Sequence, residues 1–157
     1  MNWAKYLEKN SIKLMLIGAL AALGGLAIAG GGIAYADKPS FCSSCHSMQY
    51  VAATWQESNH RQFSCGECHL PQENIIEKLM VKNQTGMHDT YHELLRDYPD
   101  TIRVSAKGRG IIDHNCLRCH AYTVAKTPMS AGGQSCTKCH RGMIHNQIGI
   151  KEGVPVE

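Results

Sequence analysis

The segment Cys42-Ser-Ser-Cys45-His46 shows a pattern, C-x-x-C-H, that returns three more times along the chain, as Cys65-Gly-Glu-Cys68-His69, Cys116-Leu-Arg-Cys119-His120 and Cys136-Thr-Lys-Cys139-His140. The four copies account for all eight cysteines. C-x-x-C-H is the attachment signature of c-type haem. Two thiols about one helical turn apart add to the two vinyl groups of one porphyrin, and the adjacent histidine lies under the iron. The sequence therefore predicts four covalently bound haems c.

Paired cysteines also build zinc sites and disulfide frameworks. A zinc site does not need a histidine directly after every second cysteine, yet all four motifs have one. Four repeated C-x-x-C pairs also suit haem or dithiol redox chemistry better than structural crosslinks. We expect haem attachment and keep zinc and disulfides as alternatives.

The composition predicts a domain whose apolar interior is made of haem. The whole chain contains two Phe and two Trp, a small stock for a polypeptide core. We expect a mainly α-helical fold with much loop: one N-terminal transmembrane helix and a small multihaem cytochrome c domain built around four haems. The formal net charge of +3 omits the haem propionates, so it gives no indication of nucleic-acid binding. We expect no nucleic-acid partner.

A membrane anchor is predicted near the N-terminus. Residues 14–35 read LMLIGALAALGGLAIAGGGIAY, 22 residues without a charge, which is long enough to span a hydrocarbon core of about 30 Å. Three lysines precede it and stay cytoplasmic by the positive-inside bias: Lys5, Lys9 and Lys13.

This pattern divides the chain into a cytoplasmic N-terminus (1–13), an anchor helix in the bacterial inner membrane (14–36) and a periplasmic haem domain (37–157). A cleaved signal is the alternative, since Ala34-Tyr35-Ala36 resembles a cleavage site. The apolar region of a signal is about 7–15 residues long, so an uncleaved anchor is favoured. The first motif starts soon after the anchor, so its haem is expected close to the membrane.

The motifs form two pairs, 42–69 and 116–140, with a helical insert at 72–98 between them. Apolar side chains recur at helical spacing in the insert, and the charged ones fall largely on another face. The apolar stripe comprises Ile75, Ile76, Leu79, Met80, Met87, Tyr91, Leu94 and Leu95. Such a stripe either packs on the core or lies at the membrane interface or beside the first haem. Gly86 is a possible break in this helix.

Axial ligands are sought among histidines and methionines. The motif histidines His69, His120 and His140 are the proximal candidates. His60 and His145 each lie five residues from a motif and suit bis-histidine coordination. Met48, two residues after His46, is a candidate thioether ligand of the first iron. His88, His92 and His114 remain open.

The anchor, the four motifs and the C-H-S-M variant Cys45-His46-Ser47-Met48 together resemble the NapC/NirT family of quinol dehydrogenases. The resemblance covers nearly the whole chain. It implies that Met48 coordinates the first haem in place of His46. It also implies that His60 and His145 complete the third and fourth haems. A lysine of a catalytic partner would complete the second haem, with His114 or His92 as the fallback.

The short length is similar to that of family members that serve a cytochrome c nitrite reductase. This similarity implies menaquinol as substrate, the quinone pool and membrane lipid as surroundings, and a pentahaem catalytic subunit as partner. It implies a quinol pocket lined by Lys82 and Asp89. Without the resemblance, these two residues would be interpreted as an ion pair on a solvent-exposed helix face. Alternatives are a donor to a nitrate or trimethylamine-oxide reductase, and a haem carrier without a quinol site. Pentahaem nitrite reductases usually have a C-x-x-C-K site, which is absent from this sequence.

Overall fold

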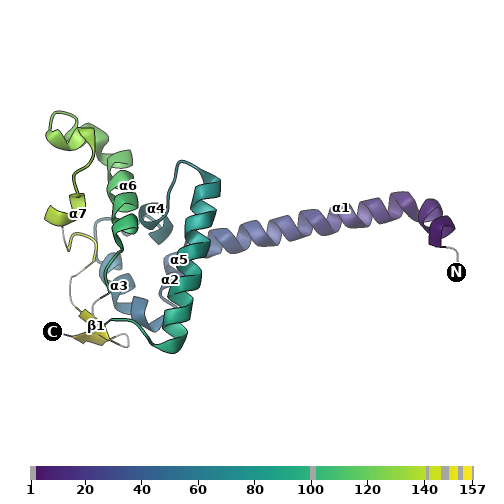
Figure 1. Ribbon diagram of the computed structural model, residues 1–157, viewed down its shortest axis with the longest axis horizontal. Helices are drawn as coiled ribbons and strands as arrows, with labels where there is room; N and C mark the ends of the chain where they lie inside the picture. Colours follow the sequence, from purple (N-terminus) through teal and green to yellow (C-terminus); the bar gives the residue numbers. More distant parts are fainter. Residues whose placement is uncertain (1–2, 100–101, 141, 146–148, 152–153, 157) are drawn as a thin grey trace. The chain divides into compact units, whose positions relative to one another are not determined.

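A computed structural model describes residues 3–99, 102–140, 142–145, 149–151 and 154–156 (Figure 1). The chain divides into two compact units, Met1–Ala36 and Asp37–Glu157.

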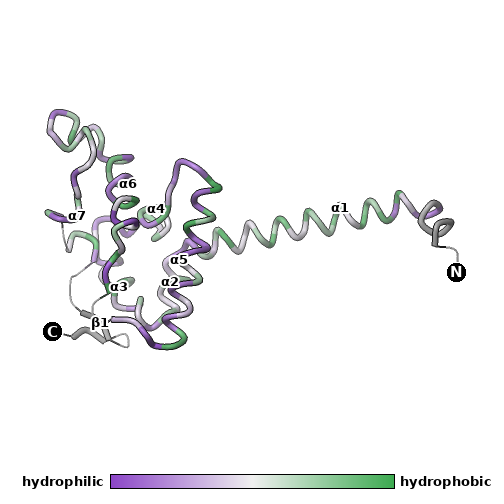
Figure 2. The backbone as a smooth tube through the Cα atoms, in the orientation of Figure 1, coloured by the Kyte–Doolittle hydropathy of each residue, from purple (hydrophilic) through white to green (hydrophobic). Residues whose placement is uncertain are grey.

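The first unit is one long helix, α1 (Trp3–Tyr35). Its segment Lys9–Tyr35 is 27 residues long and apolar enough to cross a membrane. At 1.5 Å per residue this segment extends about 40 Å, more than the hydrocarbon core requires. Figure 2 colours most of this segment white to green, the hydrophobic side of the scale, with purple near its N-terminal end. Length and composition are thus those of a single membrane-spanning helix.

The second unit is built from short helices and loops. Its helical elements are α2 (Pro39–Cys42), α3 (His46–Gln56), α4 (Cys65–His69), α5 (Ile75–Leu95), α6 (Ala106–Val124), the 3-10 helix η1 (Pro128–Ala131) and α7 (Cys136–Cys139). A small antiparallel hairpin, β1 (Gly149–Lys151) and β2 (Val154–Val156), pairs Gly149 with Val156. The expected mainly helical fold with much loop is confirmed.

Local signals set the bounds of the two longest helices of this unit. Asn74 begins α5, because its side chain accepts hydrogen bonds from the backbone N–H groups of Ile76 and Glu77. The helix runs through Gly86 without a break and ends at Arg96, whose φ of 52° is left-handed. Ser105 begins α6 by accepting a hydrogen bond from Gly108 N–H at 3.1 Å.

The second unit has almost no apolar core of its own. Among the described residues, only Leu70 and Val81 are buried apolar side chains, and Ser47 and Asn115 are buried polar ones. A folded unit of this size ordinarily buries many apolar side chains. The chain therefore leaves the interior to something other than its own side chains, as the sequence predicted for haem.

The apolar stripe of α5 lies on its outer side, so packing of this stripe on the core is a wrong expectation. The exposed fraction of its eight residues runs from 36% to 79%. The opposite side faces the unit: Val81 is buried, and Lys78, Lys82 and Glu93 are partly buried. The helix turns its charged face inward because that face meets polar partners around the first motif. Placement of the stripe at the membrane interface stays a prediction.

Asn115 joins two haem motifs and gives a test of the fold. Its Nδ2 donates to the carbonyl oxygens of Cys68 and Leu70, at 2.9 Å each. Asn115→Ala removes the donor to the Cys68 carbonyl, while the Leu70 carbonyl keeps its hydrogen bond from Gln72 Nε2. The variant is expected to lower the free energy of unfolding by about 1–3 kcal/mol. Thermal unfolding of the holoprotein measures this change. Asn83→Ala, on the exposed side of α5, is the control and should change stability by less than about 0.5 kcal/mol. Equal stability of the two variants would contradict the role given to Asn115.

Candidate haem-binding site

Three of the four motifs place both cysteines in one helix. Cys65 and Cys68 lie in α4, Cys116 and Cys119 in α6, and Cys136 and Cys139 in α7. Residues three apart in a helix lie on the same side, so each pair presents two thiols together. In the first motif Cys42 ends α2, and Cys45 directly precedes α3. All eight cysteines are free thiols, which gives no support to a disulfide framework.

Consecutive motifs lie against each other. A hydrogen bond joins the thiols of Cys42 and Cys65; it lowers the pKa of Cys42 to about 7 and raises the pKa of Cys65. Burial raises the pKa of Cys116 to about 11, and the neighbouring Cys136 adds to the shift. The first motif thus adjoins the second, and the third adjoins the fourth.

Backbone bonds complete this order. Asn115, next to the third motif, holds the carbonyl of Cys68 in the second. Asp113 of α6 accepts a hydrogen bond from Cys136 N–H at 2.9 Å, which fixes the start of the fourth motif. The four attachment sites therefore adjoin one another in sequence order, from the first to the fourth.

Two pairs of histidine rings face each other at the spacing that one metal ion requires. The ring centres of His60 and His120 lie 6.1 Å apart, and those of His69 and His145 lie 6.2 Å apart. A ligating nitrogen lies about 2.0 Å from a first-row metal and about 1.1 Å from its own ring centre, so opposed imidazoles have centres roughly 6 Å apart. Each pair fits bis-histidine coordination of one iron.

The state of these rings suits metal binding. His145 Nδ1 lies 3.0 Å from the carbonyl oxygen of Val51; a proton on Nδ1 leaves Nε2 free as a ligand. Desolvation lowers the pKa of His145 and of His69, which favours the neutral form of both rings. His60 Nδ1 is buried without a hydrogen-bond partner. A deprotonated imidazole nitrogen is the atom through which histidine binds a metal.

The histidine pairs differ from the assignment that the resemblance implied, and that assignment stays a prediction. His60 faces the third motif histidine, but His145 faces the second, His69, not the third or fourth. The other histidines considered for the second haem have neighbours of their own. His92 stacks on His88 at 4.4 Å, and His114 lies 3.4 Å from a carboxylate oxygen of Glu73. Of the described residues, no histidine ring stands opposite His140.

At the first motif, a carboxylate of α5 holds the start of α3. Glu93 accepts hydrogen bonds from His46 N–H and from the Ser47 hydroxyl, each at 2.6 Å. His46 and Met48 are two positions apart in α3, so their side chains point to nearly opposite sides of the helix. Only one of the two can face a haem held by Cys42 and Cys45. This either-or choice fits the expected use of Met48, which stays a prediction.

The two expected quinol-pocket residues lie on the same side of α5, two turns apart, and have different partners. Lys82 donates a hydrogen bond to Asp37. Asp89 is 77% exposed, and its Oδ1 lies 3.3 Å from His88 Nδ1. Burial raises the pKa of Cys45, and the carboxylates of Glu93 and Asp89 add to this shift. Asp89 thus lies near the first motif, as a quinol-pocket residue would have to.

Asp37 is a site residue that the sequence reading missed. It accepts from Lys82 and, at 3.2 Å, from Lys78. Burial opposes its ionisation, but the hydrogen bonds from both lysines outweigh burial and hold the pKa of Asp37 below its usual range. The ion pairs therefore persist at neutral and mildly acidic pH and are lost only as pH falls through that lowered pKa. The sequence signal that could have identified Asp37 is its position, two residues beyond the apolar segment.

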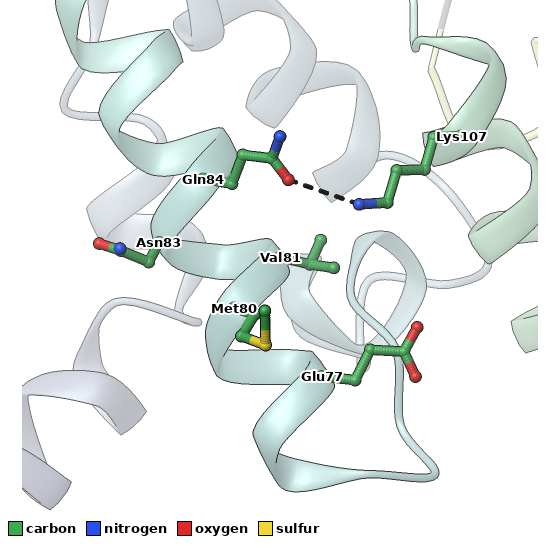
Figure 3. Close-up of a pocket in the computed structure, with 6 residues that line it drawn as sticks. All are labelled: Glu77, Met80, Val81, Asn83, Gln84 and Lys107. Carbon is green, nitrogen blue, oxygen red and sulfur yellow. Dashed lines mark hydrogen bonds between the residues drawn. The ribbon is translucent and has the colours of Figure 1, made fainter.

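A hollow of about 380 Å³ lies on a different side of α5 (Figure 3). Gln84 of this helix accepts a hydrogen bond from Lys107 of α6 across it, at 3.4 Å. The hollow contains none of the expected site residues; its lining residues are Glu77, Met80, Val81, Asn83, Gln84 and Lys107. Elsewhere in the described part of the chain, no three His, Cys, Asp or Glu side chains converge on a point that could hold a bare metal ion. The zinc alternative thus gains no support.

Comparison with known proteins gives a family match. Residues 5–150 match the NapC/NirT cytochrome c family, N-terminal region. The chain is similar to the cytochrome c nitrite reductase subunit NrfH of Nitratidesulfovibrio vulgaris, with 34% identity over 87% of this chain and 86% of the relative. It is also similar to the cytochrome c-type protein NrfH of Wolinella succinogenes, with 30% identity over 94% and 91%.

A solved structure agrees with these relatives. A chain in the crystal structure of the cytochrome c nitrite reductase NrfHA complex bound to the HQNO inhibitor superimposes with a TM-score of 0.74. It is 34% identical and covers 82% of this chain and 87% of its own length.

Proposed function

Because the chain belongs to the NapC/NirT cytochrome c family, we propose that it is a membrane-anchored tetrahaem quinol dehydrogenase. It oxidises menaquinol and delivers the electrons to the catalytic subunit of a cytochrome c nitrite reductase. The NrfH relatives and the NrfHA structure, each matched over more than four fifths of both chains, support this function. The observation that carries it is the contiguous order of four haem-attachment sites in a chain with one membrane-spanning helix.

The residues present fit haem c. Four pairs of thiols would hold four porphyrins, and the pairs His69–His145 and His60–His120 would hold two of the irons from both sides. When bound, haem supplies one-electron redox chemistry. The chain contributes the order of the sites, because each motif is bonded to the next. A path for electrons from a membrane donor to an external acceptor needs such an uninterrupted order.

The donor side lies at the first motif. Cys42 follows the last residue of α1 by seven positions, a span of at most about 25 Å. We propose that α1 crosses the inner membrane and that the second unit is periplasmic, so that a lipid-soluble quinol reaches this site. Menaquinol must release two protons as it is oxidised. Asp89 is the proposed proton acceptor, and Lys82 is the proposed hydrogen-bond donor to the quinol oxygen.

The acceptor side lies at the fourth motif. His140 is exposed, and among the described residues no imidazole stands opposite it. We propose that the catalytic partner docks here and donates the missing axial ligand, a lysine. The resemblance had placed this external ligand at the second haem. Because the His69–His145 pair supports an internal ligand for the second haem, we propose the external ligand at the fourth, at the far end of the motif order from the membrane anchor.

The acceptor itself has one alternative. The chain is also 25% identical to the cytochrome c-type protein TorC of Escherichia coli, although it spans only 44% of that relative's length. A donor to another periplasmic reductase would share the membrane anchor and the four haem-attachment sites.

Copurification distinguishes these acceptors. The full chain, extracted from its native membrane in mild detergent, is expected to carry four haems and to bring with it a pentahaem cytochrome. Mass spectrometry identifies the partner, and a haem stain counts the attached groups. A molybdenum reductase in place of the pentahaem cytochrome would favour the alternative.

A further inference from the structure

We infer that Asp37 is a positioning residue of the quinol site, which acts by fixing the Lys82 ammonium beside the first haem motif. This inference rests on the proposed quinol oxidation. It adds a third residue to the pair Lys82 and Asp89, and it gives Lys82 a fixed partner from outside its own helix.

The Asp37 carboxylate pairs with two lysines, Lys78 and Lys82, and we call these three side chains the clamp. Oδ1 accepts from Lys82 and Oδ2 accepts from Lys78, one ammonium on each oxygen. The exposed side-chain fractions are 17% for Asp37, 19% for Lys82 and 20% for Lys78. A pair so far withdrawn from water is screened less by solvent and salt than an exposed one. Asp37 therefore restrains Lys82 more firmly than a surface partner would.

A restrained lysine suits a quinol site better than a free one. Lysine carries its charge on a flexible four-carbon stem, so without a partner its ammonium samples many positions. A donor fixed in advance stabilises the negative charge that develops on a quinol oxygen as its proton leaves.

The clamp lies where the first two motifs meet. A Cβ added at Gly66, inside the second motif, would lie 2.9 Å from Cγ of Asp37. Asp37 and Lys82 also act electrostatically on the Cys42 thiol of the first motif. The glycine thus leaves room for the carboxylate, and the carboxylate holds Lys82 next to the haem-bearing Cys42. The competing account is that Asp37 only ties α5 to the chain, in which case Lys78 would matter as much as Lys82.

The test uses the full-length holoprotein in proteoliposomes with a soluble menaquinol analogue, and follows haem reduction by visible absorbance. Asp37→Asn is expected to lower kcat/KM for the quinol about tenfold to a hundredfold. Asp37→Glu, which keeps the charge, should recover most of it. Lys78→Gln, which removes only the other arm, should stay within about twofold of the parent.

A double variant separates positioning from structure. If Asp37 acts through Lys82, then Asp37→Asn combined with Lys82→Gln is no slower than Lys82→Gln alone. Multiplied losses in the double variant, or a loss in Lys78→Gln equal to that in Asp37→Asn, overturn the inference. Haem reduction by dithionite verifies that each variant carries four haems.

Gly66→Ala provides a second route if Asp37→Asn does not assemble. Its methyl group displaces the carboxylate without removing it, and the expected result is a several-fold loss with quinol and none with dithionite. Full quinol activity in Gly66→Ala would then overturn the inference. No quinol-driven reduction in the parent protein would instead overturn the proposed function, and the inference with it.

Discussion

Asp89→Asn is expected to lower quinol-driven haem reduction about a hundredfold or more while leaving dithionite reduction unchanged. The amide cannot take the proton that leaves the quinol, and general-base catalysis contributes about 10²–10⁴-fold. The carboxylate lies close enough to the first motif to act on Cys45. Stopped-flow absorbance of the four-haem protein, mixed with a menaquinol analogue, measures the rate.

Asp97, two residues beyond the end of α5, provides a matched control. Asp97 is 79% exposed, nearly the same as Asp89, and its carboxylate lies 3.8 Å from His92. Asp97→Asn makes the same chemical change away from the first motif and should leave the rate within about twofold of the parent. An unchanged rate in Asp89→Asn would remove Asp89 from the quinol site. Equal losses in both variants would point to a general effect of surface charge.

His145→Ala is expected to open one axial position of the second haem. The iron would change from low-spin bis-histidine to a five-coordinate high-spin state, and its potential would rise because histidine ligation stabilises the oxidised form. Electron paramagnetic resonance should show the loss of one low-spin signal and a new high-spin one. Binding of carbon monoxide to the reduced protein should increase by one haem.

The pairing with His69 has its own test. Because the two rings face each other across one site, the double variant His69→Ala with His145→Ala should alter the same single haem. If His145 served the fourth haem, the double variant would lose two low-spin signals. His114→Ala, which removes an exposed ring paired with Glu73, is the control and should leave all signals in place.

The sequence predicted the parts of this protein that depend on local chemistry. The C-x-x-C-H motifs, the apolar helix and the helical insert all follow from spacing within a few residues. The insert was expected at 72–98, and α5 runs from Ile75 to Leu95. Caps at Asn74 and Arg96, not apolar periodicity, decide those ends.

The sequence did not predict which face of α5 packs against the rest of the unit. The rule that an apolar stripe packs inward assumes a core of apolar side chains. Here the described unit buries almost none, and the first motif offers polar partners to Lys82 and Glu93 instead. The apolar stripe is consequently outside.

Contacts between residues far apart in the chain also could not be predicted from sequence patterns. His145 lies five residues after His140, and this spacing does not fix which haem it serves. The chain instead returns to α3, where Val51 binds the His145 ring and turns it towards His69. Asp37 meets Lys82 across 45 residues. Such contacts depend on the tertiary path, which no local pattern contains.

The most direct test of the proposed function is a quinol-to-nitrite assay in proteoliposomes that contain the full chain and the copurified pentahaem partner. Menaquinol is expected to reduce the haems of the anchored chain, and nitrite is expected to reoxidise them only when the partner is present. Haems that stay oxidised with menaquinol, yet are reduced by dithionite, would contradict quinol oxidation by this protein.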